Sequence, residues 1–276
     1  MLSLGDMIRK SQPTLFWCMR SLSKPKREAV FTLFAFCRHL DSVARSSMPY
    51  AEKQDLLNAW REELDNIYER KVPLTNIGRK IYKNCLRFNL PKELWFDILN
   101  SAFLKANSTS DMPDMETFAQ YVRGSAEVPF QLALMIIDGE HPKVGEELAK
   151  NLGQAVLLTY MLRDVKDDAK AGQLYLPKEL LLQADVKQNT QREIVEDKNF
   201  MYVREKLAEE AEKGYVKADR LLARMNYADA RTFRMLHNLG YCQFNMMKER
   251  GWEIISPKPN VNIIKRLNIF YHTIFG

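Results

Sequence analysis

The sequence has no long hydrophobic run and no export signal. No apolar stretch reaches the roughly 18 residues that a membrane-spanning helix requires, although 46% of the 276 residues are hydrophobic. The first residues, MLSLGDMIRKSQP, lack the apolar block and the small-residue cleavage site of a signal peptide. We therefore expect a chain that neither spans a membrane nor is exported, with a cytoplasmic location.

Cysteine is sparse and shows no metal-binding spacing. The four cysteines are Cys18, Cys37, Cys85 and Cys242, and none of them forms a CxxC pair. A structural zinc site is therefore not expected. Because the missing export signal indicates a reducing compartment, the thiols should not form disulfides.

The chain is basic, but its positive charge is not gathered in one block. The formal net charge is +6 and the isoelectric point is about 9.0. Basic and acidic residues are interleaved along the whole sequence, so a nucleic-acid partner is not expected. The positive balance still suits an anionic small molecule or a membrane surface.

Glycine and proline, with 11 of each, separate long segments that have helical spacing. Apolar residues recur every three or four positions, as Leu57, Trp60 and Leu64 do, and alternating runs typical of β-strands are absent. The predicted helices cover residues 27–47, 51–70, 74–88, 92–105, 114–137, 143–170, 193–225 and 228–250. Pro129 should kink the fifth of them. No linker or repeat interrupts the pattern, so we expect an all-α fold in a single domain over residues 1–276.

The last segment, NVNIIKRLNIFYHTIFG, is a short amphipathic stretch. Lys265 and Arg266 stand beside isoleucine, leucine and phenylalanine. A closing helix packed on the body of the protein is the interpretation that we favour. The alternative is a helix on a membrane surface, because a basic rim beside an aromatic face suits an anionic interface.

One predicted helix, FTLFAFCRHLDSVARSS, carries charge within an otherwise apolar sequence. Asp41 has Arg38 three residues before it and Arg45 four residues after it, so the three side chains share one helical face. An ordinary ion pair between Asp41 and Arg45 would explain this pattern without any function. The functional alternative is a cluster that binds metal and phosphate.

A second predicted helix, LLTYMLRDVKDDAKAGQLYLP, contains Arg163, Asp164 and Asp168. The two aspartates are four residues apart and therefore project from one face. Carboxylates on facing helices can hold Mg²⁺, and arginine binds phosphate in a bidentate manner. Metal and arginine together would make a diphosphate a better leaving group. Acidic pairs at this spacing are also common on solvated helix faces, so the spacing alone leaves both interpretations open.

Four segments resemble those of the squalene/phytoene synthase family. LRDVKDDAKAGQLYLPKEL resembles the second aspartate-rich motif, and its G-x-x-Y-L-P loop is matched by Gly172, Tyr175, Leu176 and Pro177. REAVFTLFAFCRHLD resembles the first motif. YVRGSAEVP is similar to the bacterial presqualene and hydroxysqualene synthases, and GYCQFNMMKERGW also matches the family. The order and approximate spacing of these segments fit along almost the whole chain.

The resemblance implies the isoprenoid synthase fold, in which helices surround a central cavity. It also implies a head-to-head prenyltransferase of squalene, hopanoid or carotenoid-type biosynthesis that acts on farnesyl diphosphate or a similar substrate, with Mg²⁺ as cofactor. By matching position it implies metal ligands at Asp41, Asp164 and Asp168, which are also catalytic, further catalytic residues at Tyr121 and Tyr241, and substrate-binding residues at Arg38, Arg163, Arg45 and Tyr175. NADPH is not expected, because no dinucleotide fingerprint is present.

The first motif departs from the family pattern D-D-x-x-D. The corresponding positions hold Asp41, Ser42 and Arg45, which changes the formal charge of the motif from −3 to 0. Two like unit charges a few Å apart repel by about 4 kcal/mol at an effective dielectric constant near 20, so a guanidinium where a dication should bind should weaken the Mg²⁺ cluster severely. We expect Arg45 to bridge instead to Asp164 or Asp168 across the cavity.

The second motif departs from the family one and two turns before Asp164. Leu157 and Tyr160 stand where the family has Gln and Asn. The Asn is a metal ligand in the family, and a tyrosine hydroxyl replaces it poorly for Mg²⁺. The sequence therefore predicts a weakened Mg²⁺ site.

Three functions are compatible with this pattern. The first is the prenyltransferase, which the well-preserved second motif favours. The second is a non-catalytic member acting as a binding or assembly factor, as in the branch resembling respiratory complex I assembly factors. The third is a prenyl-lipid carrier. The partners to consider are a prenyl diphosphate, a second family member as partner subunit, and peripheral contact with the inner membrane surface.

Overall fold

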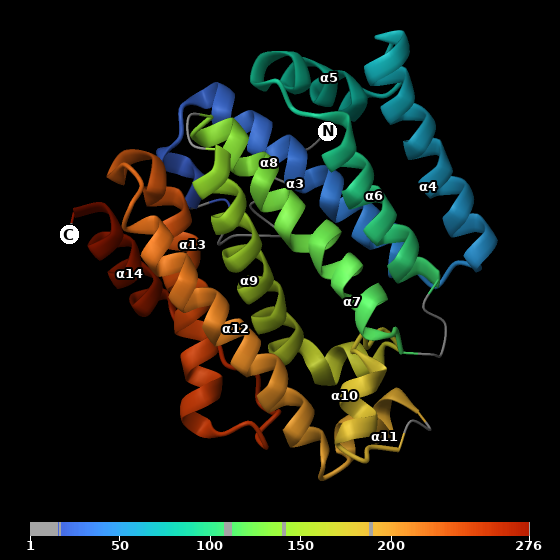
Figure 1. Ribbon diagram of the computed structural model, residues 1–276, viewed down its shortest axis with the longest axis vertical. Helices are drawn as coiled ribbons and strands as arrows, with labels where there is room; N and C mark the ends of the chain where they lie inside the picture. The colour runs from blue at the N-terminus through green and yellow to red at the C-terminus, as the bar shows by residue number, and fades with distance from the viewer. Residues whose placement is uncertain (1–15, 17, 108–111, 140–141, 188–189, 276) are drawn as a thin grey trace. The chain divides into compact units, whose positions relative to one another are not determined.

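A computed structural model of the chain describes residues 16, 18–107, 112–139, 142–187 and 190–275. Every regular element among these residues is a helix (Figure 1), so the prediction of an all-α fold is confirmed. In chain order the elements are η1 (Met19–Ser21), α3 (Lys24–Ala44), α4 (Tyr50–Asp65), η2 (Asn66–Arg70), α5 (Asn76–Phe88), α6 (Lys92–Asn107), α7 (Met115–Val122), η3 (Arg123–Glu127), α8 (Val128–Ile137), α9 (Pro142–Lys170), α10 (Lys178–Gln183), α11 (Gln191–Glu196), α12 (Phe200–Leu222), α13 (Tyr227–Arg250) and α14 (Ile263–Phe275).

The observed helices follow the predicted ones, with differences where proline or a turn intervenes. The helix predicted over 114–137 consists of α7, the π-helical turn η3 and α8. Pro129 has no N–H to offer the carbonyl of Ser125, which explains why regular α-helical bonding is interrupted just before it. The helix predicted over 193–225 is divided into α11 and α12, and the short helix α10 was not predicted.

Contacts within the chain divide it into two compact units. Unit 1 comprises residues 1–109 and 120–153, and unit 2 comprises residues 110–119 and 154–276. The first acidic motif lies in unit 1 and the second in unit 2. Each unit has its own packed interior.

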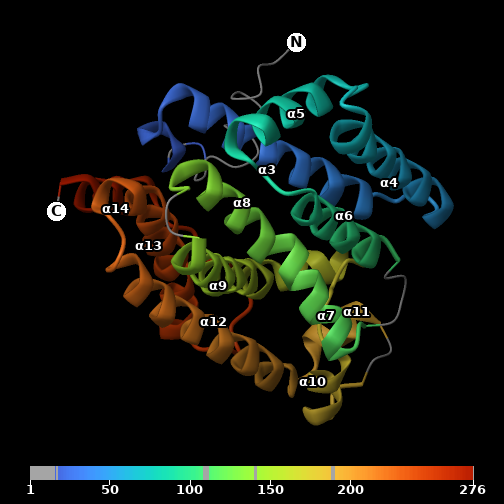
Figure 2. The same cartoon turned by 45° about the horizontal axis from the view of Figure 1, so that its top comes forward.

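Helix α3 is central to the interior of unit 1. It contacts α4, α5, α6 and α8, and Figures 1 and 2 show α6 and α8 running alongside it. Phe36 of α3 is fully buried, and its ring meets those of Trp60 and Trp95 edge-on at 5.1 Å and 5.4 Å between centroids. Edge-to-face aromatic contacts of this kind add about 0.5–1.5 kcal/mol beyond the area they bury. The apolar part of the first motif is therefore core.

A buried carboxylate fastens the start of α5 to α4. Glu63 of α4 is only 2% exposed, and it accepts hydrogen bonds from the backbone N–H groups of Leu74 and Thr75 and from the Thr75 hydroxyl. Thr75 in turn caps α5, because its hydroxyl accepts from the N–H of Gly78. The N-terminal N–H groups of a helix need such acceptors. Thr75 supplies one acceptor within the first turn of α5, and Glu63 supplies those for the two residues just before it.

The interior of unit 2 is built on α12 and α13. Helix α12 packs against α13, and α13 packs against α14 (Figure 2). Tyr215 of α12 is 1% exposed, and its hydroxyl pairs with the Thr159 hydroxyl of α9 at 2.9 Å. A buried hydroxyl needs such a partner, because leaving it without one costs about 1–3 kcal/mol. This bond ties the second half of α9 to the rest of unit 2.

Replacing Gly78 by alanine should destabilise the protein by about 2–3 kcal/mol. The new Cβ atom would lie 1.7 Å from Glu63 Oε1, whose position is fixed by its hydrogen bonds. Chemical denaturation followed by circular dichroism measures the loss.

The matched control is Gly145→Ala in α9, where the nearest atom to the new Cβ is at an ordinary 3.8 Å. This change should be neutral or stabilise the protein by up to about 1 kcal/mol, because alanine has the higher helix propensity. Equal effects of the two substitutions would contradict the role assigned to Glu63.

Candidate functional site

The C-terminal end of α9 concentrates negative charge. Asp164, Asp167 and Asp168 lie within the last two turns of this helix, which ends at Lys170. The C-terminus of a helix carries a partial negative charge of its own, so carboxylates there are unfavourable unless cations neutralise them. The property that matters for this site is therefore whether the neutralising cations are protein side chains or metal ions.

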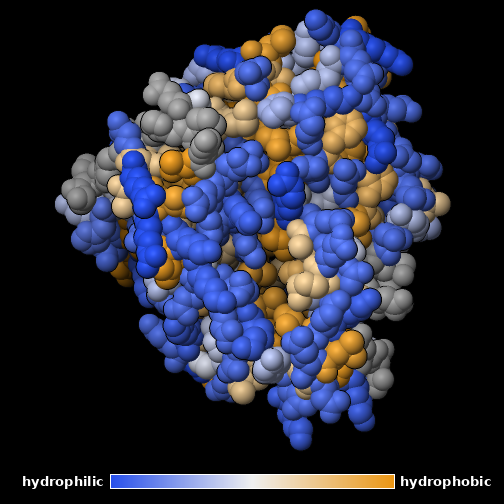
Figure 3. Space-filling view, viewed as in Figure 1, coloured by the Kyte–Doolittle hydropathy of each residue, from blue (hydrophilic) through white to orange (hydrophobic). Residues whose placement is uncertain are grey.

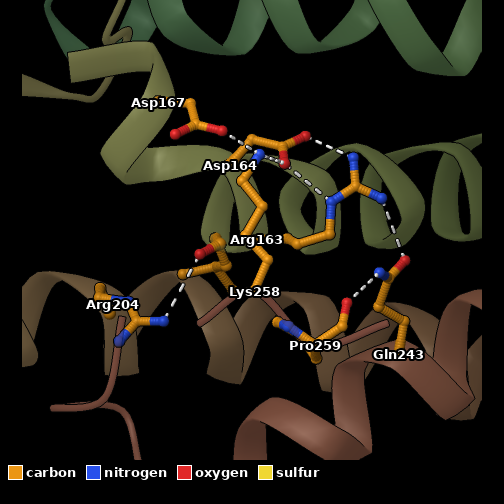
Figure 4. Close-up of polar contacts among 8 residues, drawn as sticks. Arg163, Asp164, Asp167, Arg204, Gln243, Lys258 and Pro259 are labelled. Atoms are coloured by element: carbon orange, nitrogen blue, oxygen red, sulfur yellow. Dashed lines mark hydrogen bonds and ion pairs between the residues drawn. The ribbon is translucent and has the colours of Figure 1, made fainter. Parts of the chain in front are cut away.

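Two cations from different parts of unit 2 pair with two of these carboxylates, Asp164 and Asp167 (Figure 4). Arg163 binds its neighbour Asp164 with two nitrogens, Nε to Oδ1 at 2.9 Å and Nη2 to Oδ2. Lys258, from the segment between α13 and α14, places its Nζ 2.6 Å from Asp164 Oδ1 and 2.6 Å from Asp167 Oδ2. Both oxygens of Asp164 are thus bound to protein cations.

These groups stay ionised although the site is partly buried. Burial by itself would raise the pKa of Asp164, but the hydrogen bonds from Arg163 and Lys258 outweigh it and lower that pKa. Burial would likewise lower the pKa of Arg163 and of Lys258, and their bonds to the carboxylates raise both pKa values instead. The result is a set of opposite charges that are held together, with the Asp164 side chain only 25% exposed.

The segment that carries Lys258 is fastened on both sides. Gln243 of α13 accepts a hydrogen bond from Arg163 Nη1 at 3.3 Å and donates one to the carbonyl of Pro259 at 3.1 Å. Arg204 of α12, which is 1% exposed, donates to the carbonyls of Trp252 and Ile254. Burial lowers the pKa of Arg204 to about 10, and repulsion from Arg250 adds to this effect. Lys258 is therefore positioned by anchored backbone.

Tyr160 holds the arginine of the site. Its ring lies one turn before Asp164 on α9, and the guanidinium of Arg163 sits 4.7 Å from its centroid. A guanidinium over an aromatic face is attracted by the quadrupole of the ring. Tyr160 stands at the position where the resemblance implies a metal-binding asparagine, and here its ring contacts the cation of Arg163.

The first acidic motif lies in unit 1 and is paired internally. Arg45 Nε is 3.0 Å from Asp41 Oδ1, which is the i,i+4 ion pair expected from the spacing, and both side chains are about one-third or more exposed. Such a pair contributes only a few tenths of a kcal/mol. Arg38 of the same helix is exposed. The bridge from Arg45 to Asp164 or Asp168 would join the two units, and it stays a prediction.

The three tyrosines that were expected near the reaction lie in different surroundings. Tyr121 is 6% exposed, and the Lys105 ammonium lies 5.7 Å from its ring centroid in unit 1. Tyr175 is 4% exposed in unit 2, where burial raises its pKa to about 12. Tyr241 is half-buried, and its ring packs against those of Tyr215 and Phe244 at 5.3 Å and 6.1 Å. Tyr241 thereby belongs to an aromatic cluster formed by α12 and α13, and α13 also carries Gln243.

The family model for squalene/phytoene synthases matches residues 8–261 of the chain. The chain belongs to the squalene/phytoene synthase family. A presqualene diphosphate synthase of Rhodopseudomonas palustris is 29% identical over 257 residues, which cover 93% of this chain and 90% of that protein. A phytoene synthase of Mycobacterium tuberculosis is 28% identical over 180 residues, 64% of this chain and 57% of its own.

Solved structures of synthases have the same fold. A dehydrosqualene synthase crystallised with a ligand superposes with a TM-score of 0.83 at 21% identity, over 98% of this chain and 93% of its own. A squalene synthase from Alicyclobacillus acidocaldarius gives a TM-score of 0.75 at 17% identity, over 90% of this chain and 93% of its own. The expected isoprenoid synthase fold of the family is thereby confirmed.

This family uses divalent metal to bind diphosphate, so the fit of the acidic residues to metal can be examined. Within unit 2 the second motif does not fit a multi-metal site as it is arranged, because Lys258 and Arg163 bind the oxygens that a metal would need. In the part of the chain that the structure describes, no three His, Cys, Asp or Glu side chains are grouped to hold a metal ion. The Mg²⁺ site expected from the resemblance stays a prediction.

Sequence reasoning missed Asp167, Lys258, Gln243 and Arg204. Asp167 could have been found, since it lies three residues after Asp164 on the same helix. Arg204 also leaves a signal, because it falls on the apolar stripe of α12 with Phe200, Val203 and Leu207, where a charged residue must be buried. Lys258 leaves none, because it lies between two prolines and 94 positions from its partner Asp164.

Replacing Lys258 by methionine should strengthen divalent metal binding. The change leaves Asp164 and Asp167 with one cation fewer, so the attraction of the motif for a dication increases. The dissociation constant for Mn²⁺, measured by electron paramagnetic resonance on the free ion, should fall by about tenfold or more, allowing for solvent screening at a partly exposed lysine.

Lys248→Met is the matched control, because Lys248 forms a comparable ion pair with Glu212 elsewhere in unit 2. It should leave the Mn²⁺ dissociation constant unchanged. If Lys258→Met binds Mn²⁺ no more tightly than this control, Lys258 does not compete with metal at the second motif.

Proposed function

We propose that the chain is a head-to-head prenyltransferase that joins two molecules of farnesyl diphosphate or of a similar prenyl diphosphate. Family membership supports this class of reaction, and the relatives given above are named as synthases. The observation that carries the proposal is the pair of cations, Arg163 and Lys258, at the second acidic motif. Both are groups that bind phosphate oxygens.

Charge counting supports diphosphate binding with a reduced need for metal. Around the second motif, Arg163 and Lys258 oppose Asp164, Asp167 and Asp168, which leaves a formal charge of −1. The first motif contributes Asp41 with two arginines, Arg38 and Arg45, a formal charge of +1. The two motifs together are neutral, whereas a D-D-x-x-D sequence in the first would leave −3. Protein cations therefore replace part of the positive charge that metal ions would bring.

The leaving diphosphate is the group that these cations would stabilise. When the C1–O bond of the first substrate breaks, its electron pair stays on the diphosphate, and prepositioned cations lower the energy of that charge. Phosphate oxygens compete with Asp164 for Arg163 and Lys258. The remaining allylic cation is attacked by a double bond of the second substrate, and loss of a proton gives a cyclopropylcarbinyl diphosphate.

Tyr241 is suited to protect the carbocation. The ring of Tyr241 forms an aromatic cluster with the rings of Tyr215 and Phe244 in unit 2. Aromatic faces attract cations, and an apolar environment keeps water from quenching them. The presqualene diphosphate synthase of Rhodopseudomonas palustris is named for a product of this class, which favours release of the cyclopropylcarbinyl diphosphate.

Incubation of the purified chain with labelled farnesyl diphosphate and Mg²⁺ should release diphosphate and yield an extractable coupled product. Arg163→Met should lower kcat/KM by about 100-fold or more, because a donor to the developing charge is lost. Lys166→Met, which removes an exposed cation from the same turn of α9, should retain activity. If the unmodified chain releases no diphosphate, the catalytic proposal is wrong and a binding or carrier role remains.

Restoring family-type residues tests the proposed substitution of metal by protein cations. The double variant Arg45→Asp, Tyr160→Asn changes the formal charge of the first motif by −2 and supplies an amide ligand. The Mg²⁺ concentration needed for half-maximal activity should fall, because dications bind more tightly to the more acidic site. An unchanged Mg²⁺ requirement in this variant would show that Arg45 and Tyr160 do not set the metal dependence.

A further inference from the structure

Helix α14 exposes a continuous apolar face. Ile263, Ile264, Leu267 and Tyr271 are 70%, 74%, 61% and 59% exposed. At about 100° per residue, these positions fall within an arc of about 100° on one side of the helix. The face of the protein drawn in Figure 3 is mainly hydrophilic, and single exposed apolar residues are ordinary. Four of them in one stripe indicate a surface that meets something apolar.

The opposite side of α14 is packed and holds the helix in this orientation. Thr273 is 4% exposed and accepts a hydrogen bond from Asn238 of α13 at 3.2 Å. Ile269 is half-buried on the same side, and the half-buried Phe270 lies between Thr273 and the Ile263 edge of the stripe. Because α13 already contacts that side, the exposed stripe is a second face of α14 and is left over after the fold is complete.

The charged side chains of α14 and of the segment that leads into it have one sign. After Glu253 the sequence contains no further Asp or Glu, whereas Lys265 and Arg266 lie on α14 itself. On the helix surface, the exposed Lys265 lies beyond the Ile264 edge of the stripe. Arg266 lies beyond the Ile263 edge, where it is half-buried and donates a hydrogen bond to Asn260 Oδ1 at 3.3 Å. Basic side chains on both flanks of an apolar stripe are the arrangement that binds an anionic lipid interface.

The size of the stripe favours a bilayer over a second copy of the chain. A helix of 13 residues is about 20 Å long and about 10 Å wide. One face of it offers on the order of 200 Å², whereas a standard protein interface needs about 800 Å² from each partner. A lipid surface has no such minimum, because it adapts to whatever area enters it. Like basic charges on two copies would also repel each other.

We propose that α14 docks the protein on an anionic lipid bilayer surface. The stripe of Ile263, Ile264, Leu267 and Tyr271 enters the boundary between headgroups and acyl chains, and Lys265 and Arg266 contact the lipid phosphates. None of the described helices has the length and apolar content needed to cross a bilayer, so the contact is peripheral. This inference does not depend on the proposed reaction.

Flotation of the full chain with vesicles tests the proposal. Vesicles of equal parts phosphatidylcholine and phosphatidylglycerol should carry the protein upward, and vesicles of phosphatidylcholine alone should carry much less. Ile264→Gln with Leu267→Gln should weaken binding by about tenfold or more. Lys265→Gln with Arg266→Gln should weaken binding to the anionic vesicles by about 30-fold, from about 1 kcal/mol for each cation.

The matched control is Leu86→Gln, because Leu86 of α5 is a 67% exposed apolar residue outside α14. It should bind vesicles as the unmodified chain does, and thermal unfolding should show that all the variants remain folded. Equal binding by the Ile264/Leu267 variant and the unmodified chain would overturn the proposal. So would a dimer in sedimentation velocity that this variant converts to monomer, combined with absent vesicle binding, because the stripe would then be a contact between copies.

Discussion

The acidic end of α9 in unit 2 depends on two protein cations. Asp164, Asp167 and Asp168 would repel each other, and the helix dipole would disfavour them further, if no cation were near. Arg163 and Lys258 offset part of that repulsion, and Lys258 connects α9 to the segment between α13 and α14. The charge of the proposed site and the local stability of this part of the chain therefore rest on the same ion pairs.

The same ion pairs are compatible with a second motif that keeps its aspartates while the first motif has serine and arginine at two aspartate positions of the family pattern. In the first motif Arg45 pairs with Asp41, and in the second Tyr160 binds Arg163 through its ring. Two of the departures from the family pattern, Arg45 and Tyr160, thus take part in contacts between protein groups. Both contacts involve an arginine, which agrees with the proposed use of protein cations in place of part of the metal charge.

Local patterns in the sequence were enough to predict the fold, and part of the site. The helical periodicity placed α3, α9 and α13 nearly in full. The ion pair between Asp41 and Arg45 was the alternative that their spacing left open, whereas a bridge from Arg45 to the second motif was expected. These features follow from residues three or four positions apart. Lys258 could not be predicted, because its contact with α9 forms only when α13 has reversed the chain and brought residue 258 back to the acidic turn. The position of Gln243 between Arg163 and Pro259 is of the same long-range kind.

The short span between Lys258 and Ile263 has a mechanical consequence. Five residues extend over at most about 18 Å, so the α-carbons of Lys258 and Ile263 stay within that distance of each other. The ion pairs of Lys258 with Asp164 and Asp167 therefore also limit how far the start of α14 can lie from the acidic turn.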